Sequence, residues 1–211
     1  MSAQAAPATP ITATGTEARN LDGQAIAITV FSTIRPWGNV IAPIPGRIFL
    51  PILFVVTRRI PKLTVTLRQL SFIHFARWTV ITRLPYNGAP QAKKRFRYPH
   101  MYFESNFNGG WEEYIDAFSH ILTDGMAAFW GSSYGFPKAL PVGPFKRYIQ
   151  DNETEASHYY SAYPEATITM VKGALDVERK VAPLKRNAAK MEPDAFAAAY
   201  ERFLTEAQRS L

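Results

Sequence analysis

The sequence predicts an α+β fold in which two split β-α-β units form an antiparallel four-stranded sheet with helices on one face. Two observations support this fold class. Hydrophobic residues make up 47% and aromatic residues 13% of the 211 positions, which is enough for a sizeable core. Segments rich in β-branched and aromatic residues alternate with segments of helical periodicity, and proline or glycine separates them.

The first strand and helix are expected in the region before residue 61. Residues 25–31 (AIAITVF) are β-branched and apolar, which favours a strand, and residues 35–38 (RPWG) end it. A helix is predicted over residues 47–60, with Pro51 in its first turn or at a kink, and Pro61 ends it.

Two further strands and the second helix are expected in the middle of the chain. Thr, Val, Ile, Phe and Trp dominate residues 66–81, so this segment is predicted to be a long strand. A loop over residues 84–94 leads to a third strand over residues 97–107. Asn-Gly-Gly at 108–110 ends that strand, and apolar residues then recur with helical spacing from Trp111 to Trp130.

The last part of the chain is predicted to add one strand and several helices. Residues 131–144 form a long connection rich in glycine, proline and serine, which is typical of a lid or binding loop. A short helix is expected over 144–151, and a strand with three tyrosines over 157–163. Helices are then predicted over 167–181 and from Pro193 to about residue 209.

The resulting order, β-α-β-β-α-β followed by helices, is the ferredoxin-like pattern. We expect residues 1–24, rich in Ala, Thr, Pro and Gly, to form a disordered tail without the features of a secretory signal. Residues 25–182 are predicted to form the ferredoxin-like domain. Pro183 is expected to end a helix, and residues 183–211 to form a C-terminal helical extension.

Three motifs resemble a bacterial family of ferredoxin-like proteins of the dimeric α+β-barrel type, which has no assigned activity. They are FIHFARW, YFESNFNGGW followed two residues later by Tyr, and YYSAYPEAT, and the resemblance covers about residues 26–180. The resemblance implies a homo-oligomer. It also implies a distant likeness in fold to dye-decolorizing peroxidases, chlorite dismutases and antibiotic-biosynthesis monooxygenases, from which no catalytic residue carries over.

Charge and cysteine content limit the partners. The net charge of +7 favours acidic partners such as anionic lipid, nucleic acid or an anionic substrate. The absence of cysteine excludes a thiolate nucleophile, a disulfide framework and Cys-ligated metal, and it fits a reducing, cytoplasmic compartment. The longest apolar run, from Ile48 to Val56, is too short to span a membrane, which requires about 20 residues.

Polar residues inside the second and third predicted strands mark a candidate catalytic cluster. His74, Arg77 and Glu104 lie among large apolar residues, and the two strands are expected to be antiparallel neighbours. In one interpretation His74 is an acid/base or axial ligand, Arg77 polarises an anion or peroxide, and Glu104 orients them. In the other they form a satisfied buried ion pair, which stabilises the fold little. Alternation places His74 and Arg77 on opposite faces unless the strand is bulged.

A ligand bound at this cluster would contact either the sheet face that carries Glu104 or the tyrosine-rich segment at residues 157–163. The candidate ligand-binding residues are Tyr102, Asn106, His158 and Tyr160. The spacing of the four histidines fits no zinc motif, so no metal site is predicted. The distant likeness in fold to peroxidases and chlorite dismutases makes haem a candidate cofactor. His74, His100 and His158 are the candidate axial ligands of the haem iron.

An alternative function is docking of an accessory protein to a membrane surface or a larger complex. The residues expected on that surface are Leu50, Phe54, Arg58 and Arg59, because an apolar run is followed directly by basic residues. Nucleic-acid binding through Lys93-Lys94-Arg95-Phe96-Arg97 is disfavoured, since the run is short and lacks an aromatic RNA-binding signature. Small-molecule binding on the sheet face ranks slightly ahead of docking.

Overall fold

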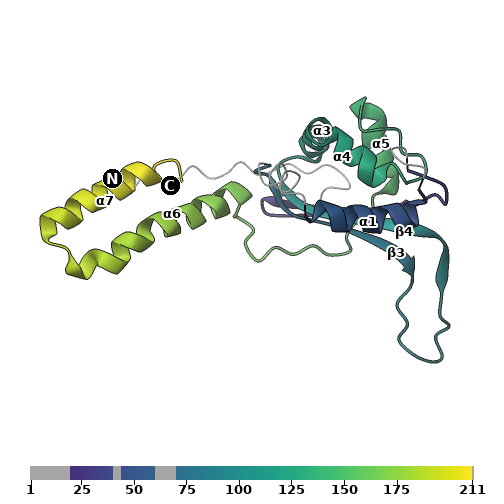
Figure 1. Cartoon of the computed structure of the whole chain (residues 1–211), viewed down its shortest axis with the longest axis horizontal. Coiled ribbons are helices and arrows are strands. Elements are labelled where there is room, and N and C mark those ends of the chain that lie inside the picture. The colour runs from purple at the N-terminus through teal and green to yellow at the C-terminus, as the bar shows by residue number, and fades with distance from the viewer. Residues whose placement is uncertain (1–19, 40–43, 60–69, 211) are drawn as a thin grey trace. The chain divides into compact units, whose positions relative to one another are not determined.

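The protein consists of two compact units, Met1–Pro164 and Glu165–Leu211, in a computed structural model (Figure 1). The structure describes residues 20–39, 44–59 and 70–210. Most of the expected N-terminal tail therefore lies outside the described residues, whereas residues 20–24 are folded. The division falls at Pro164, not at the predicted position 182/183, because a helix runs through that predicted boundary.

The first unit contains a four-stranded antiparallel sheet, which confirms the α+β class. Its strands are β1 (Leu21–Asp22), β2 (Ala25–Thr33), β3 (Ile73–Arg83) and β4 (Arg95–Asn108). The order across the sheet is β1-β2-β4-β3. β4 thus pairs with both long neighbours and lies in the interior of the sheet.

Alternation along the strands sends one set of side chains to the core. On β4 the odd-numbered residues Met101, Phe103 and Phe107 are buried, and on β2 the residues Val30 and Ile26, opposite Phe103 and Phe107, are also buried. The even-numbered residues of β4 face the other way. Each strand therefore contributes one apolar row to a core on a single side of the sheet.

The described residues of this unit form four helices. They are α1 (Gly46–Thr57), α3 (Trp111–Ile121), α4 (Thr123–Trp130) and α5 (Val142–Asn152). The helix predicted over 111–130 is interrupted at Leu122, whose φ of −117° and ψ of 29° are not helical. Figure 1 shows α3, α4 and α5 above the sheet and α1 beside β3.

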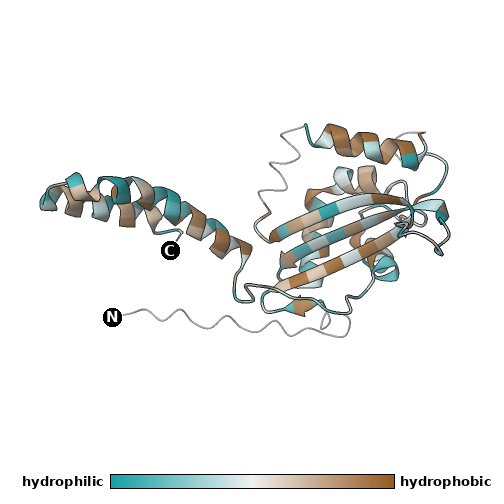
Figure 2. Ribbon diagram, turned by 90° about the horizontal axis from the view of Figure 1, so that it is seen from below, coloured by the Kyte–Doolittle hydropathy of each residue, from teal (hydrophilic) through white to brown (hydrophobic). Residues whose placement is uncertain are grey.

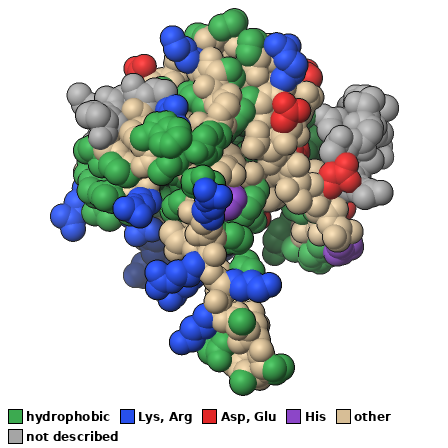
Figure 3. All heavy atoms as spheres, turned by 90° about the vertical axis from the view of Figure 1, so that its right-hand side faces the viewer, with side chains coloured by type: hydrophobic (Ala, Val, Ile, Leu, Met, Phe, Trp, Pro, Cys, Tyr) green, Lys and Arg blue, Asp and Glu red, His purple; other side chains and the backbone are tan. Residues whose placement is uncertain are grey.

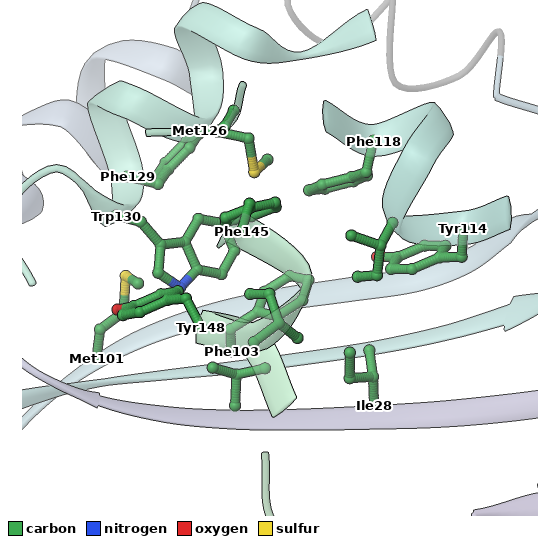
Figure 4. Packing of buried hydrophobic residues seen from close by; sticks show 14 of the residues in the cluster. Ile28, Met101, Phe103, Tyr114, Phe118, Met126, Phe129, Trp130, Phe145 and Tyr148 are labelled. Atoms are coloured by element: carbon green, nitrogen blue, oxygen red, sulfur yellow. The ribbon is translucent and has the colours of Figure 1, made fainter. Parts of the chain in front are cut away.

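Aromatic side chains fill the space between the sheet and these helices (Figure 4). Trp130 is 1% exposed, and its ring lies edge-on to Phe103 with 4.9 Å between centroids. Tyr114 stacks on Phe107 at 3.9 Å. Such rings bury large apolar areas and also constrain orientation.

The predicted strand over residues 157–163 is absent, because the polar groups of this segment bond to side chains instead of a strand. The backbone N–H of Ser161 donates to the Asp22 carboxylate over 2.6 Å. Just before the segment, the N–H of Ala156 donates to the Asn20 side chain over 2.8 Å. The edge of β2 is instead paired with the two-residue strand β1, which lies in the segment expected to be a disordered tail.

The connection at 131–144, predicted to be a lid or binding loop, begins with buried residues that contact the end of β2, whereas Tyr134 and Leu140 further along it are 40% and 38% exposed. Ser132 and Ser133 are buried, and Ser133 forms an isolated bridge with Ile34. The Ser133 and Ser32 hydroxyl oxygens lie 3.0 Å apart. These serines fix the end of β2 to the chain beyond α4.

The second unit is a helical hairpin of α6 (Ile168–Asn187), the short helix η2 (Ala188–Lys190) and α7 (Pro193–Ala207). Pro183 lies inside α6, so this proline does not end the helix as predicted. Lys180 Nζ donates to the backbone oxygen of Glu206 over 2.6 Å, and Ser210 Oγ lies 2.7 Å from an Asp176 carboxylate oxygen. These contacts join the first half of α6 to the end of α7.

Because one row of β2 side chains is buried, shortening one of these side chains should lower the stability of the first unit. Ile28→Ala should lower the free energy of unfolding of the first unit by about 2–5 kcal/mol, because Ile28 is 1% exposed and a cavity would remain. All four tryptophans lie in the first unit, so denaturant unfolding followed by tryptophan fluorescence reports on it.

Ile52→Ala is the matched control, since Ile52 is 55% exposed, and it should change the free energy of unfolding by less than about 0.5 kcal/mol. Equal losses in the two variants would contradict the placement of the core.

Candidate functional site

One face of the sheet is free of described helices of the first unit (Figure 2). Two of the candidate catalytic residues, Arg77 and Glu104, lie on it. β4 contributes His100, Tyr102, Glu104 and Asn106 to this face. The neighbouring strands contribute Ala27, Thr29, Phe31, Thr33, Phe75, Arg77, Thr79 and Ile81, which lie opposite them in the register. We call this surface the open face. It mixes apolar and polar side chains.

Arg77 and Glu104 lie directly opposite each other and form an ion pair. Arg77 Nη2 is 2.8 Å from Glu104 Oε2, and the Tyr102 hydroxyl donates to the same oxygen over 3.0 Å. The Arg77 guanidinium carbon also lies 5.3 Å from the centroid of the Tyr102 ring. These contacts, led by the hydrogen bond to Tyr102, raise the pKa of Arg77, so its positive charge is fixed.

His74 does not join this pair. The register shifts between Ile73 and Phe75, so His74 occupies a bulge at the start of β3. Its Nε2 atom is buried and has no hydrogen-bond partner among the described residues. Glu104 therefore pairs with Arg77, and the predicted grouping of His74, Arg77 and Glu104 is divided.

The other predicted ligand-binding residues are dispersed. Tyr102 and Asn106 share the open face with Glu104, whereas His158 is exposed and Tyr160 is 73% exposed on the irregular segment after α5. Tyr159, which the sequence did not single out as a site residue, lies closer to the cluster. Burial raises the pKa of Tyr159, and the carboxylates of Asp22 and Glu104 raise this pKa further.

The Arg77–Glu104 pair is largely in contact with solvent. The side chains are 66% and 33% exposed, and ion pairs at such positions stabilise proteins by about 0–1 kcal/mol. With Tyr102 as a third partner, Glu104 Oε2 has its hydrogen bonds satisfied within the sheet. The hydrogen bonds of the pair are satisfied as in the ion-pair interpretation, but the pair is not buried as that interpretation expected.

Two of the four residues predicted for a docking surface on α1 do not lie at the surface. Leu50 is fully buried and Phe54 stacks on Phe129 with 5.6 Å between ring centroids, so neither residue is at the surface as predicted. Arg58 and Arg59 are exposed.

The exposed side of α1 carries Ile48, Ile52, Val55 and Val56, which are between 46 and 57% exposed. Their spacing of i, i+4, i+7 and i+8 places them on one helical stripe, which we call the α1 ridge. This spacing is visible in the sequence, but the inward-facing residues on the other side of α1, such as Leu50 and Phe54, are also four positions apart. Periodicity alone therefore did not separate the two sides.

Basic side chains border the α1 ridge and continue along the β3–β4 hairpin (Figure 3). The exposed residues are Arg47, Arg58, Arg59, Arg83, Lys93, Lys94, Arg95 and Arg97. Arg83 and Arg95 are direct cross-strand partners, an arrangement of like charges that destabilises a hairpin. Between positions 23 and 103 the sequence has twelve Lys and Arg residues and no Asp or Glu. An anionic partner would relieve this repulsion.

A cavity of about 400 Å³ lies on the opposite side of the sheet from the Arg77–Glu104 pair. Its apolar walls come from Trp78 on β3 and from Phe118 and Phe129 on α3 and α4, and His120 and Asp124 contribute polar groups. The sequence does not predict His120 as a site residue, because its place at the cavity depends on the break between α3 and α4 at Leu122.

The described residues contain no group of three or more His, Asp or Glu side chains arranged to hold a metal ion. Of the candidate haem ligands, His100 is enclosed between Phe31, stacked at 4.7 Å, and Phe96, edge-on at 4.8 Å. Burial lowers the pKa of His100. Its Nδ1 atom, like Nε2 of His74, is buried, so these two nitrogen atoms do not face an open cavity.

No known protein family, curated protein or solved structure matches the chain. Within the described ranges, none of the helices combines the length and apolar character needed to cross a membrane.

The exposure of the Arg77–Glu104 pair predicts a small contribution to stability. In a double-mutant cycle with Arg77→Met and Glu104→Gln, the coupling free energy should be at most about 1 kcal/mol, measured by denaturant unfolding. A coupling of several kcal/mol would mean that the pair is shielded from water, and would contradict the open face described above.

Proposed function

We propose that the protein binds the surface of anionic membranes as a peripheral protein, with α1 as the inserting helix. The observation that supports this proposal most strongly is the α1 ridge, an exposed apolar stripe with Arg47 at one end and Arg58 and Arg59 at the other. Amphipathic helices that lie in the membrane interface combine an apolar face with flanking basic residues.

The opposite side of α1 explains how the helix would be held. Leu50 is fully buried and Phe54 stacks on Phe129, so the inner side of α1 is packed onto the folded unit. Both sides of the helix are therefore apolar, which in a water-soluble protein is typical of a buried helix. The twelve residues of α1 span about 18 Å, and such a helix would lie parallel to the membrane plane.

The basic side chains of the β3–β4 hairpin would attract the protein electrostatically to the anionic membrane surface that α1 enters. Each Lys or Arg close to an anionic membrane contributes about 1 kcal/mol. Arg83, Lys93, Lys94 and Arg95 are exposed, and none of them forms an ion pair with a described residue. Tyr86, which lies under the Lys93 ammonium at 5.1 Å, adds an aromatic group of the kind enriched at membrane interfaces.

The finer fold assignment supports this placement. We infer a ferredoxin-like arrangement in which β2, β3 and β4 correspond to the first three strands and β1 takes the edge position of the fourth. In that arrangement β3 is an edge strand, so α1 can lie beside it with one side exposed. Membership of the bacterial dimeric α+β-barrel type family, and a cytoplasmic location, stay predictions.

Vesicle co-sedimentation tests the proposal. The protein should bind phosphatidylserine-containing vesicles at physiological salt and should not bind pure phosphatidylcholine vesicles. Ile52→Glu should abolish binding, because it places a carboxylate in the α1 ridge. Replacing Lys93, Lys94 and Arg95 together with Gln should weaken binding by roughly fivefold per charge.

Tyr163→Glu is the control, since Tyr163 is 77% exposed and lies outside α1 and the hairpin, and it should bind like the wild type. Binding that is equal on neutral and anionic vesicles, or that survives Ile52→Glu, would refute the proposal.

A second candidate function, binding of a small molecule, rests on the cavity beside α4. Its volume of about 400 Å³ lies within the usual range for ligand sites, and its walls are mainly apolar with a few polar groups. The class of ligand that fits is an apolar or aromatic molecule. Placement of the ligand on the open face instead, and an oxidative or haem-linked activity there, stay predictions.

Filling the cavity should abolish ligand binding. Gly125 lines the cavity, and a Cβ added there would meet only the Leu122 side chain at 3.7 Å, so Gly125→Leu should fold. The wild type should enhance the fluorescence of cis-parinaric acid, and Gly125→Leu should not. Gly143→Leu in α5 is the matched control, because a Cβ there meets only Arg147 at 3.9 Å. Equal enhancement in both variants would show that the cavity is not the site.

A further inference from the structure

The cavity beside α4 has apolar walls and has its charged groups at the opening. Phe118 and Phe129, which line the cavity, are 2 and 9% exposed (Figure 4). His120 and Asp124 are exposed to solvent, and we call the opening that they border the rim. The hydroxyl of Thr123, which also lines the cavity, already donates to a backbone oxygen of α3 over 2.6 Å. A ligand would therefore place an apolar group inside the cavity and a polar group at the rim.

The aromatic rings in the walls are already stacked on other rings. Phe129 stacks on Trp78 with 5.1 Å between centroids and on Phe54 of α1 with 5.6 Å. Phe118 stacks on Tyr114 at 5.3 Å. A flat aromatic ligand gains most from an unused ring face, and these contacts occupy such faces. The rest of the apolar lining is aliphatic: Ile121, Leu122 and Met126. A flexible aliphatic chain fits these walls better than a flat ring does.

The cavity lies next to the helix that is proposed to enter the membrane. Phe129 lines the cavity and also packs on Phe54 of α1, so the two sites share this side chain. Trp78 belongs to β3, the edge strand beside which α1 lies (Figure 1). Membrane binding through the α1 ridge would hold the cavity within reach of lipid chains. The aliphatic molecules most abundant near the cavity are then lipids.

We propose that the cavity binds the hydrocarbon chain of a single-chain phospholipid whose head group carries an ammonium group. This inference rests on the second candidate function, ligand binding in the same cavity, and names the class of ligand. The volume of about 400 Å³ lies near the lower end of the range for ligand sites, so it suits one chain. The second chain of an ordinary membrane phospholipid would stay in water, which is unfavourable for an apolar group.

The rim favours a head group with both charges over the carboxylate of a fatty acid. Asp124 forms no ion pair with another residue of the described ranges, so its carboxylate is available to an ammonium group. The same carboxylate repels the carboxylate of a fatty acid. His120 also borders the rim, and its ring carries at least one N–H donor for a phosphate oxygen.

Displacement of cis-parinaric acid from the wild-type protein tests the binding of the chain. Lysophosphatidylcholines of increasing chain length, each below its micelle concentration, should displace the bound probe. The dissociation constant should fall by roughly tenfold for every two added CH₂ groups and should level off once the chain fills the cavity. If cis-parinaric acid does not bind, the cavity is not a ligand site and both proposals for it are wrong. If it binds and lysophosphatidylcholine does not displace it, or does so equally at every chain length, ligand binding stands and only the single-chain assignment is wrong.

A second test compares two ligands that have the same chain, laurate and dodecylphosphocholine. Asp124→Asn should weaken the binding of dodecylphosphocholine and strengthen that of laurate, each by about two- to fivefold, because an exposed charge pair has a modest energy. Asp124 is exposed, so this variant should fold. Asp151→Asn, at an exposed position of α5 outside the lining, is the control and should leave both dissociation constants unchanged. The absence of a shift in Asp124→Asn, or a shift in the same direction for both ligands, would overturn the assignment of the head group.

Discussion

The antiparallel pairing of β4 with both β2 and β3 is the constraint on which the first unit depends. Nine residue pairs join β2 to β4, and this register decides which side chains face the helices. It sends Met101, Phe103 and Phe107 into the core and leaves Tyr102 and Glu104 on the open face. A shift by one residue would exchange the two sets, which is why the register is strongly specified.

The same pairing determines where the two candidate functions lie. Arg77 lies opposite Glu104 because β3 pairs with β4 in this register, and the pair then neutralises itself in contact with solvent. β3 is left as an edge of the sheet, with α1 beside it. Among the described residues of the first unit, exposed apolar side chains, and basic side chains without an ion-pair partner, consequently lie on the outer side of α1 and on the β3–β4 hairpin, whereas the polar cluster inside the strands is paired.

The sequence predicted the elements of the first unit where periodicity and strand composition were strong. The strands around Ile28, Trp78 and Phe103 and the helices after Pro45 and Gly110 are present. Failures occurred where tertiary contacts outweigh local propensity. Residues 157–163 have strand-like composition, yet the Ser161 N–H donates to the Asp22 carboxylate and not to a neighbouring strand. Pro183 lies inside α6 because this residue gives up only its own N–H group in a helix fixed by other contacts.

The candidate sites were predictable only in part, for a related reason. Cross-strand pairing predicted that Glu104 would meet Arg77 or His74, but the bulge at His74 that decided between them has no signature in the sequence. The apolar run on α1 predicted a surface near Arg58. Which of its residues face outward depends on the packing of Phe54 against Phe129, a contact across 75 positions of sequence.

The depth of α1 in a lipid bilayer tests the membrane proposal most directly. A spin label on Val55→Cys, the only thiol in the chain, should become accessible to oxygen and inaccessible to a water-soluble nickel reagent when anionic vesicles are added. A label on Thr79→Cys, on the open face, should stay accessible to the nickel reagent. If the label at position 55 remains exposed to the nickel reagent on saturating vesicles, α1 does not enter the membrane interface and the proposed function is wrong.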